Sequence, residues 1–173
     1  AGFGSTVNRS DTNLNNINVT LAARAYDTDN GTGNYIESNR NASFYVTTNG
    51  TALDSGTFVQ TNASGYLSTI FNPNCTYGVG AQLWRSGTEN DACYKNSFSS
   101  DFGITILGQL KQNLSYPTQG QVIPVGNVVV FNVSVPTDCT NEGLLNQTNV
   151  TIEMIGPGQY RTCTSIYDSG NGY

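Results

Sequence analysis

Apolar residues alternate with polar ones over many short segments, and this two-residue period restricts the fold more than any other feature of the chain. Successive side chains of a strand point to opposite faces, so each such segment buries one face and exposes the other. The spacing of an amphipathic helix is not found. The sequence therefore predicts an all-β sandwich. The expected strands are residues 17–26, 42–48, 56–61, 66–71, 77–85, 102–107, 121–125, 128–135, 148–155 and 160–167.

Most of the polar side chains of this chain are uncharged amides and hydroxyls, which provide more of its solvation than charged groups do. Its 173 residues include 22 Asn, 21 Thr and 15 Ser, whereas only 11% are charged. The net charge of −5 gives little attraction for phosphates, so we expect no nucleic-acid partner. No apolar run approaches the roughly 18 residues that a membrane-spanning helix needs, and we expect no membrane insertion.

The acceptor pattern for N-linked glycans, Asn-x-Ser/Thr (the sequon), is unusually frequent. Composition alone would give roughly four or five matches, but the chain contains eleven. In the expected strands, the asparagine has the opposite parity from the apolar residues and should face solvent, where a bulky sugar is tolerated. The sequence therefore predicts covalent N-linked glycans on an extracellular or cell-surface protein. The sequon asparagines are Asn8, Asn18, Asn30, Asn41, Asn49, Asn62, Asn74, Asn113, Asn132, Asn146 and Asn149.

Two halves of the chain resemble each other at an offset of about 108 residues, the length of one sandwich domain. The predicted domains are residues 1–108 and 109–173, with the boundary after the strand that ends at Leu107. The aligned segments are 41–46 with 149–154, 62–66 with 169–173, and 17–26 with 128–135.

The second copy stops at Tyr173, which aligns with Tyr66 of the first, so it lacks the equivalents of 67–108, about three strands of a seven-strand sandwich. Such a sandwich would expose apolar surface and unpaired edges. Three explanations are open. The chain continues beyond Tyr173, a neighbouring subunit supplies strands, or the second copy folds as a smaller disulfide-stapled unit.

Four cysteines occur, at Cys75, Cys93, Cys139 and Cys163, without a Cys-x-x-Cys pair and without any histidine, so no zinc site is expected. The domain boundary favours Cys75 with Cys93 and Cys139 with Cys163. Each bond would close a loop of about 20 residues and contribute ~3 kcal/mol. Free buried thiols are the alternative, which an oxidising compartment disfavours.

Two stretches, Gly56–Tyr66 and Tyr77–Trp84, resemble the Thr/Asp-x-x-Gly-Tyr and Tyr-x-x-Gly-x-x-x-aromatic patterns of tandem immunoglobulin-like repeats in large extracellular and cell-surface glycoproteins. Tyr116–Gly126 is similar to the opening strands of those repeats. The resemblance implies two tandem immunoglobulin-like β-sandwich domains, the second incomplete at its C-terminal end, and a surface location. It carries over no catalytic or ligand-binding residue.

Asp27 and Asp29, two residues apart before Gly31, resemble the first half of a calcium loop. No glutamate follows at the required spacing, and a polar turn between strands explains the same residues. The sequence thus gives a weak calcium candidate, and no other metal or cofactor is expected.

Candidate catalytic groups are few. Without histidine, a serine nucleophile would depend on Lys95 or Lys111 as its base. Glu89 and Asp91 are two residues apart and would share a face, so they would not flank a glycosidic bond. We therefore expect no enzymatic activity.

These observations favour a structural subunit of an extracellular fibre, pilus-like appendage or surface coat. Glycans would cover the faces and edges of the sandwiches, and association through the free ends would build a linear homopolymer. The alternative is an adhesin or carbohydrate-binding surface module. An aromatic platform for sugars would suit that alternative, but a cross-strand packing cluster is the favoured interpretation of the same residues. These residues are Tyr77, Trp84, Tyr94 and Phe98.

Overall fold

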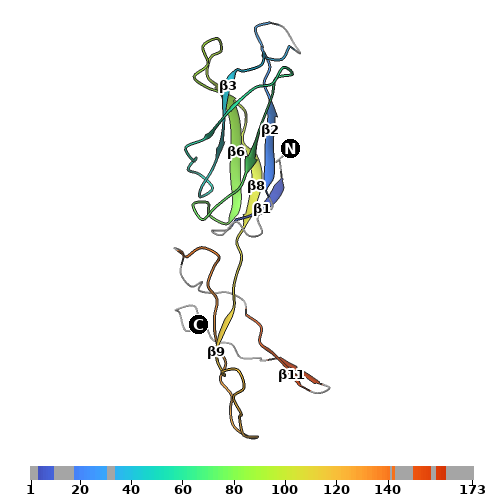
Figure 1. Ribbon diagram of the computed structural model, residues 1–173, viewed down its shortest axis with the longest axis vertical. Helices are drawn as coiled ribbons and strands as arrows, with labels where there is room; N and C mark the ends of the chain where they lie inside the picture. The colour runs from blue at the N-terminus through green and yellow to red at the C-terminus, as the bar shows by residue number, and fades with distance from the viewer. Residues whose placement is uncertain are drawn as a thin grey trace. The chain divides into compact units, whose positions relative to one another are not determined.

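Figure 1 shows the computed structural model, which is all-β in the residues that it describes: 4–9, 18–30, 34–140, 142, 150–156 and 159–162. The chain divides into two compact units, Ala1–Gly108 (unit 1) and Gln109–Tyr173 (unit 2). This division coincides with the boundary expected from the sequence repeat. No described residue belongs to a helix that could cross a membrane.

Unit 1 contains two sheets. The larger has the strand order β1-β8-β6-β3-β4, with β7 also beside β6, and the smaller pairs β2 with β5. All pairs are antiparallel except β1 with β8, which is parallel. The strands are β1 (Ser5–Asn8), β2 (Val19–Arg24), β3 (Asn41–Val46), β4 (Thr57–Gln60), β5 (Tyr66–Phe71), β6 (Gly80–Thr88), β7 (Ser97–Phe98) and β8 (Phe102–Leu107).

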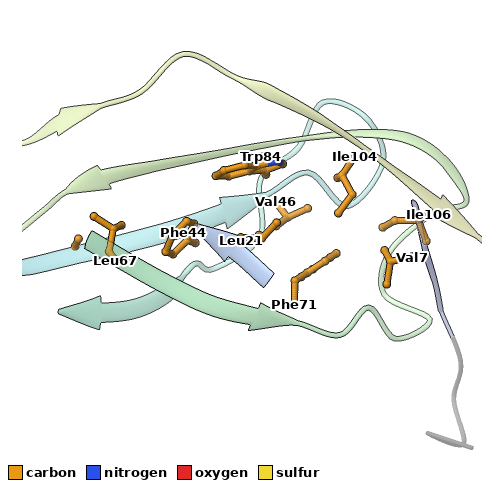
Figure 2. Close-up of a cluster of buried hydrophobic side chains, with 10 residues drawn as sticks. Val7, Leu21, Phe44, Val46, Leu67, Phe71, Trp84, Ile104 and Ile106 are labelled. Atoms are coloured by element: carbon orange, nitrogen blue, oxygen red, sulfur yellow. The ribbon is translucent and has the colours of Figure 1, made fainter. Parts of the chain in front are cut away.

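The core of unit 1 lies between these two sheets, because each contributes the apolar half of its alternating residues (Figure 2). In β3, for example, Ala42, Phe44 and Val46 are buried while the residues between them are only partly covered. The edge strands β1 and β4 of the larger sheet contact β2 and β5 respectively, so the larger sheet curls around the smaller. The buried cluster consists of Val7, Leu21, Ala42, Phe44, Val46, Leu67, Phe71, Trp84, Ile104 and Ile106.

Unit 2 contains two separate antiparallel pairs among its described residues. β9 (Asn113–Tyr116) pairs with β10 (Asn132–Ser134), and β11 (Glu153–Gly156) pairs with β12 (Gln159–Thr162). Between β9 and β10, three valines are strongly exposed: Val122 at 90%, Val125 at 106% and Val128 at 92%. This unit therefore leaves much of its apolar sequence in contact with solvent.

The strand predictions were most accurate in unit 1, where β5 and β8 have the expected bounds. The predicted strand 121–125 is wrong. Pro124 there has no N–H to donate, its carbonyl accepts from Asn127, and Gly126 adopts a positive φ of 95°. The sequence also missed β1, β7 and β9, which are four residues or fewer and lack a run of alternating apolar residues.

Candidate functional site

Three connections meet at one end of unit 1, which we call the loop end. They are the described parts of residues 25–40 after β2 (25–30 and 34–40), residues 61–65 before β5, and residues 89–96 after β6. Contacts hold them together. The Tyr94 hydroxyl donates to Asp27 Oδ2 at 3.4 Å, and Gly65 lies directly against the Ala25 carbonyl and the Tyr35 side chain. Because loops at one end of a sandwich commonly carry binding residues, the loop end is the candidate functional site.

Aromatic side chains surround Arg24 at the loop end, and we call Arg24, Tyr26, Tyr35 and Tyr66 the Arg24 cluster. The guanidinium carbon lies 3.1 Å from the Tyr35 ring centroid and 4.4 Å from that of Tyr66. The rings of Tyr26 and Tyr35 are 5.1 Å apart. The three tyrosines remain 53%, 40% and 48% exposed in the order Tyr26, Tyr35 and Tyr66. They therefore leave aromatic surface exposed to solvent around one cation.

The Arg24 cluster was not predicted from the sequence. Arg24 and Tyr26 have the outward parity of the expected strand 17–26, which was a usable signal. The contribution of Tyr35 and Tyr66 was not predictable from spacing. It depends on the pairing of Arg24 with Tyr66 between β2 and β5, and on the bridge that joins Tyr26 to Tyr35.

Asp27 accepts hydrogen bonds from residues of the loops at this end. Its Oδ1 accepts the backbone N–H groups of Asp29 and Asn30 at 3.1 and 3.2 Å, and its Oδ2 accepts the Tyr94 hydroxyl. This is the turn that the sequence offered as the alternative to a calcium loop. Within the described residues, no group of three or more acidic, cysteine or histidine side chains is placed to hold a metal ion.

Asp91 organises residues 89–96. Its two carboxylate oxygens accept three backbone N–H groups, from Asn41 at 2.9 Å, Cys93 at 2.8 Å and Tyr94 at 3.2 Å. The bond from Asn41, followed by that from Cys93, lowers the pKa of Asp91 below its usual range. Glu89 accepts the Tyr45 hydroxyl instead. The two carboxylates thus hold separate backbone and hydroxyl partners.

The cysteines differ from the expected pairing. Cys93 is a free, exposed thiol, whereas Cys75 is disulfide-bonded, so the predicted Cys75–Cys93 bond is not formed. The two cysteines flank opposite ends of the nine-residue β6. A strand of that length spans roughly 27 Å, whereas a disulfide needs Cα atoms within about 7 Å. Cys139 is disulfide-bonded as well, and Cys163 lies outside the described residues. With Cys93 free, only three cysteines remain for pairing, so Cys75 and Cys139 cannot belong to two separate bonds, and neither predicted pair is formed.

Arg40 connects Cys93 with the loop 25–40. Its Nη2 donates to Glu37, forming an ion pair, and its Nη1 lies 3.2 Å from Cys93 Sγ. The guanidinium carbon is also 5.7 Å from the Tyr94 ring centroid. These contacts join two of the three connections at the loop end through one side chain.

The four residues proposed as an aromatic platform do not lie together. Trp84 is 2% exposed and packs against Phe44 in the core (Figure 2). It also packs against Phe102. Only Tyr94 reaches the loop end. Tyr77 instead stands edge-on to Phe71, and its hydroxyl donates to Asp54 Oδ2 at 2.7 Å. Phe98 packs against Tyr45 on the outer face of the larger sheet.

The sequon asparagines are mostly exposed. In unit 1, Asn8 and Asn41 are partly buried. The parity argument holds around Asn18 and Asn41, whose strands bury Leu21 and Phe44 respectively. Asn146 and Asn149 lie outside the described residues. The exposed sequon asparagines are Asn18, Asn30, Asn49, Asn62, Asn74, Asn113 and Asn132.

The chain matches no protein-family model, no curated protein and no solved structure.

Proposed function

We propose that this protein is a structural subunit of an extracellular, N-glycosylated fibre, pilus-like appendage or surface coat, and that copies of it assemble into a linear homopolymer. The observation that carries this proposal is the exposure of the apolar side chains between β9 and β10. Val122, Val125 and Val128 leave nearly all of their surface in water, although burial of one such side chain contributes about 1.5–3 kcal/mol.

A strand from a neighbouring copy would cover this surface. β9 and β10 form a two-stranded sheet, and an isolated pair of strands is marginally stable in water. Strand addition satisfies the open N–H and C=O groups of a sheet edge and buries the alternate side chains. A contact between unit 2 of one copy and a different surface of the next is heterologous, and such contacts build open filaments when rotation does not close a ring.

The strand order of unit 1 supports an immunoglobulin-like sandwich as the repeating module. In that fold, strands C, F and G form one sheet and face strands B and E of the other. Here β3, β6 and β8 are neighbours in the larger sheet, and β2 pairs with β5 in the smaller. For unit 2, the same assignment rests on the sequence repeat alone.

An extracellular location is supported by two further observations. Cys75 and Cys139 are disulfide-bonded, and disulfides persist mainly in oxidising compartments. Seven sequon asparagines are exposed in the described residues, and N-linked sugars are carried at the protein surface. The proposal includes no catalysis, cofactor or nucleic-acid partner, and the carboxylates of Glu89 and Asp91 have structural partners.

Negative-stain imaging of the purified protein over a range of concentrations tests the assembly. We expect rods or filaments whose length increases with concentration. Dispersed monomers at every concentration, both before and after enzymatic deglycosylation, would contradict the proposal.

The Arg24 cluster favours a second candidate function, a carbohydrate-binding surface module. Exposed tyrosine rings around a cation combine apolar faces with hydrogen-bonding groups. Binding to a glycan array should then be lost in Tyr35→Ala and Tyr66→Ala. It should be retained in Phe58→Ala, which removes an aromatic ring that is 62% exposed outside the cluster. Equal binding by all three variants would exclude this function for the loop end.

A further inference from the structure

Three exposed sequons share one local geometry. The side-chain oxygen Oδ1 of Asn49, Asn62 and Asn74 accepts the backbone N–H of the residue two positions on, at 3.1, 2.9 and 2.9 Å respectively. That residue is the Ser or Thr of the sequon itself. Each sequon is therefore an Asx turn, in which the asparagine carbonyl is fixed by its own motif.

This geometry presents the amide nitrogen. Oδ1 faces the turn, because it also accepts from Ala52 for Asn49 and from Tyr66 for Asn62. Among the described residues, no hydrogen bond uses Nδ2 of any of the three asparagines. Nδ2 is thus held at the surface, on the side of the amide that faces away from the turn. A sugar bonded there would leave every one of these turn hydrogen bonds intact.

Asn41 carries the same motif in a different arrangement. Its Nδ2 donates to the Asn90 carbonyl at 3.1 Å, and its Oδ1 accepts Gln60 Nε2 at 3.4 Å. Its backbone N–H binds Asp91, and the residue is partly buried at the start of β3. A sugar on Nδ2 would occupy the place of the Asn90 carbonyl and separate residues 89–96 from β3.

We propose that the folded protein is glycosylated at Asn49, Asn62 and Asn74 and is left unmodified at Asn41. This inference rests on the proposed extracellular function and adds which acceptors are used. The donor is an oligosaccharide linked to a lipid through pyrophosphate. A bond forms between Nδ2 and the anomeric carbon, the bond from that carbon to the pyrophosphate oxygen breaks, and Nδ2 releases one proton.

Substitution of the third sequon residue tests the proposal without removing any asparagine. Ser64→Ala and Thr76→Ala each destroy one sequon and retain the Asx turn, because the donor to Oδ1 is a backbone N–H. Thr51→Ala does the same but also removes a hydroxyl that donates to Asn49 at 3.0 Å. Ser43→Ala is the matched control, since it destroys the Asn41 sequon and leaves the Asn41 hydrogen bonds in place.

Each full-length variant is secreted from a host that performs N-glycosylation, and its intact mass is compared with that of the wild type. We expect Thr51→Ala, Ser64→Ala and Thr76→Ala each to lose the mass of one glycan, and Ser43→Ala to lose none. Loss of a glycan in Ser43→Ala, or wild-type glycan mass in any of the other three, overturns the assignment. A wild type without any sugar would overturn the glycosylated function as well, which distinguishes the two failures.

Discussion

Three carboxylates in unit 1, those of Asp27, Asp54 and Asp91, each accept three hydrogen bonds from loop residues or from neighbouring strands. Asp91 accepts the N–H groups described above at the loop end. Asp54 accepts the N–H groups of Val46 at 3.2 Å and Gly56 at 3.0 Å, together with the Tyr77 hydroxyl at 2.7 Å. Bonds to a charged acceptor are about twice as strong as neutral ones. Single acidic residues thus fix loops that a strand pattern does not predict.

Removing the charge of Asp91 tests this role. Asp91→Asn should lower the free energy of unfolding at neutral pH by about 1 kcal/mol, because one carboxylate oxygen is replaced by a donor and the loop is solvent-screened. The pKa of Asp91 is lowered by folding. The ionised Asp91 therefore contributes its full stabilisation of the folded state above the unfolded pKa of about 3.9. That stabilisation is lost as the pH falls through the lower pKa of the folded state.

Thermal denaturation followed by circular dichroism, at about pH 7 and about pH 3, measures this dependence. We expect the stability gap between wild type and Asp91→Asn to shrink at the lower pH. Asp101→Asn, which changes an exposed acid near β8, should differ little from wild type at either pH. A gap that is equal at both pH values would show that the Asp91 charge does not stabilise the loop.

Tyr77 gives the opposite dependence on pH. Burial of the ring, followed by its bond to the Asp54 carboxylate, raises the pKa of the Tyr77 hydroxyl well above its usual value. The folded state therefore keeps this proton more tightly, so the stabilisation is complete below the unfolded pKa of about 10 and is lost as the pH rises above it. Tyr77→Phe should lower the stability by about 1 kcal/mol at neutral pH, through loss of the hydrogen bond.

Denaturation by urea at about pH 7 and about pH 10.5 distinguishes the variant from the wild type. The wild type should lose more stability between these pH values than Tyr77→Phe does, because only the wild type must ionise this buried hydroxyl on unfolding. Equal losses in both proteins would contradict the assigned environment of Tyr77.

At the scale of elements, the sequence predicted strands well where alternation was complete. In β8, Ile104 and Ile106 are buried and the residues between them are not, and the expected bounds were correct. β1 has only Val7 as an apolar residue, and its partner β8 lies far along the chain, so no local pattern could reveal it. The bounds of the core strands could thus be predicted from the sequence. The pairing of the edge strand β1 and the Arg24 cluster could not, because they depend on contacts between residues far apart in the chain.

Gly65 illustrates a turn that only glycine satisfies. It adopts a φ of +70°, and an added Cβ would lie 2.8 Å from both the Ala25 carbonyl oxygen and the Tyr35 Cβ. Gly65→Ala should therefore lower the free energy of unfolding by about 1–3 kcal/mol. Gly103→Ala in β8 is the control, because nothing lies within 4 Å of its added Cβ, and its change should remain within about 0.5 kcal/mol. Chemical denaturation measures both, and equal effects would refute the steric argument.

At the scale of the whole molecule, unit 1 has a buried apolar cluster, whereas most apolar side chains in the described part of unit 2 are exposed. Only the sequence repeat suggested this difference, because composition and parity are similar in both units. If the exposed valines form the contact between copies, introducing a charge there should stop assembly and leave the fold of unit 1 unchanged.

Val125→Lys and Val128→Lys test this expectation by sedimentation velocity and negative-stain imaging. Both variants should remain monomeric at concentrations where the wild type forms filaments, because an unpaired charge resists burial. Ile70→Lys provides a matched control, since Ile70 is an equally apolar residue that is 68% exposed on β5 of unit 1. Filaments of normal length from the Val125 and Val128 variants would exclude this surface as the contact.

The parallel pairing of β1 with β8 has a consequence for a subunit under tension. Ser5 lies opposite Ile104, and Asn8 lies opposite Leu107, so the chain enters this ladder at one end and leaves it at the other. A pull between Ser5 and Leu107 acts along both strands in opposite directions. All hydrogen bonds between β1 and β8 then bear the force together in shear, instead of breaking one after another. The pairing of β1 with β8 therefore makes unit 1 resist extension along its length.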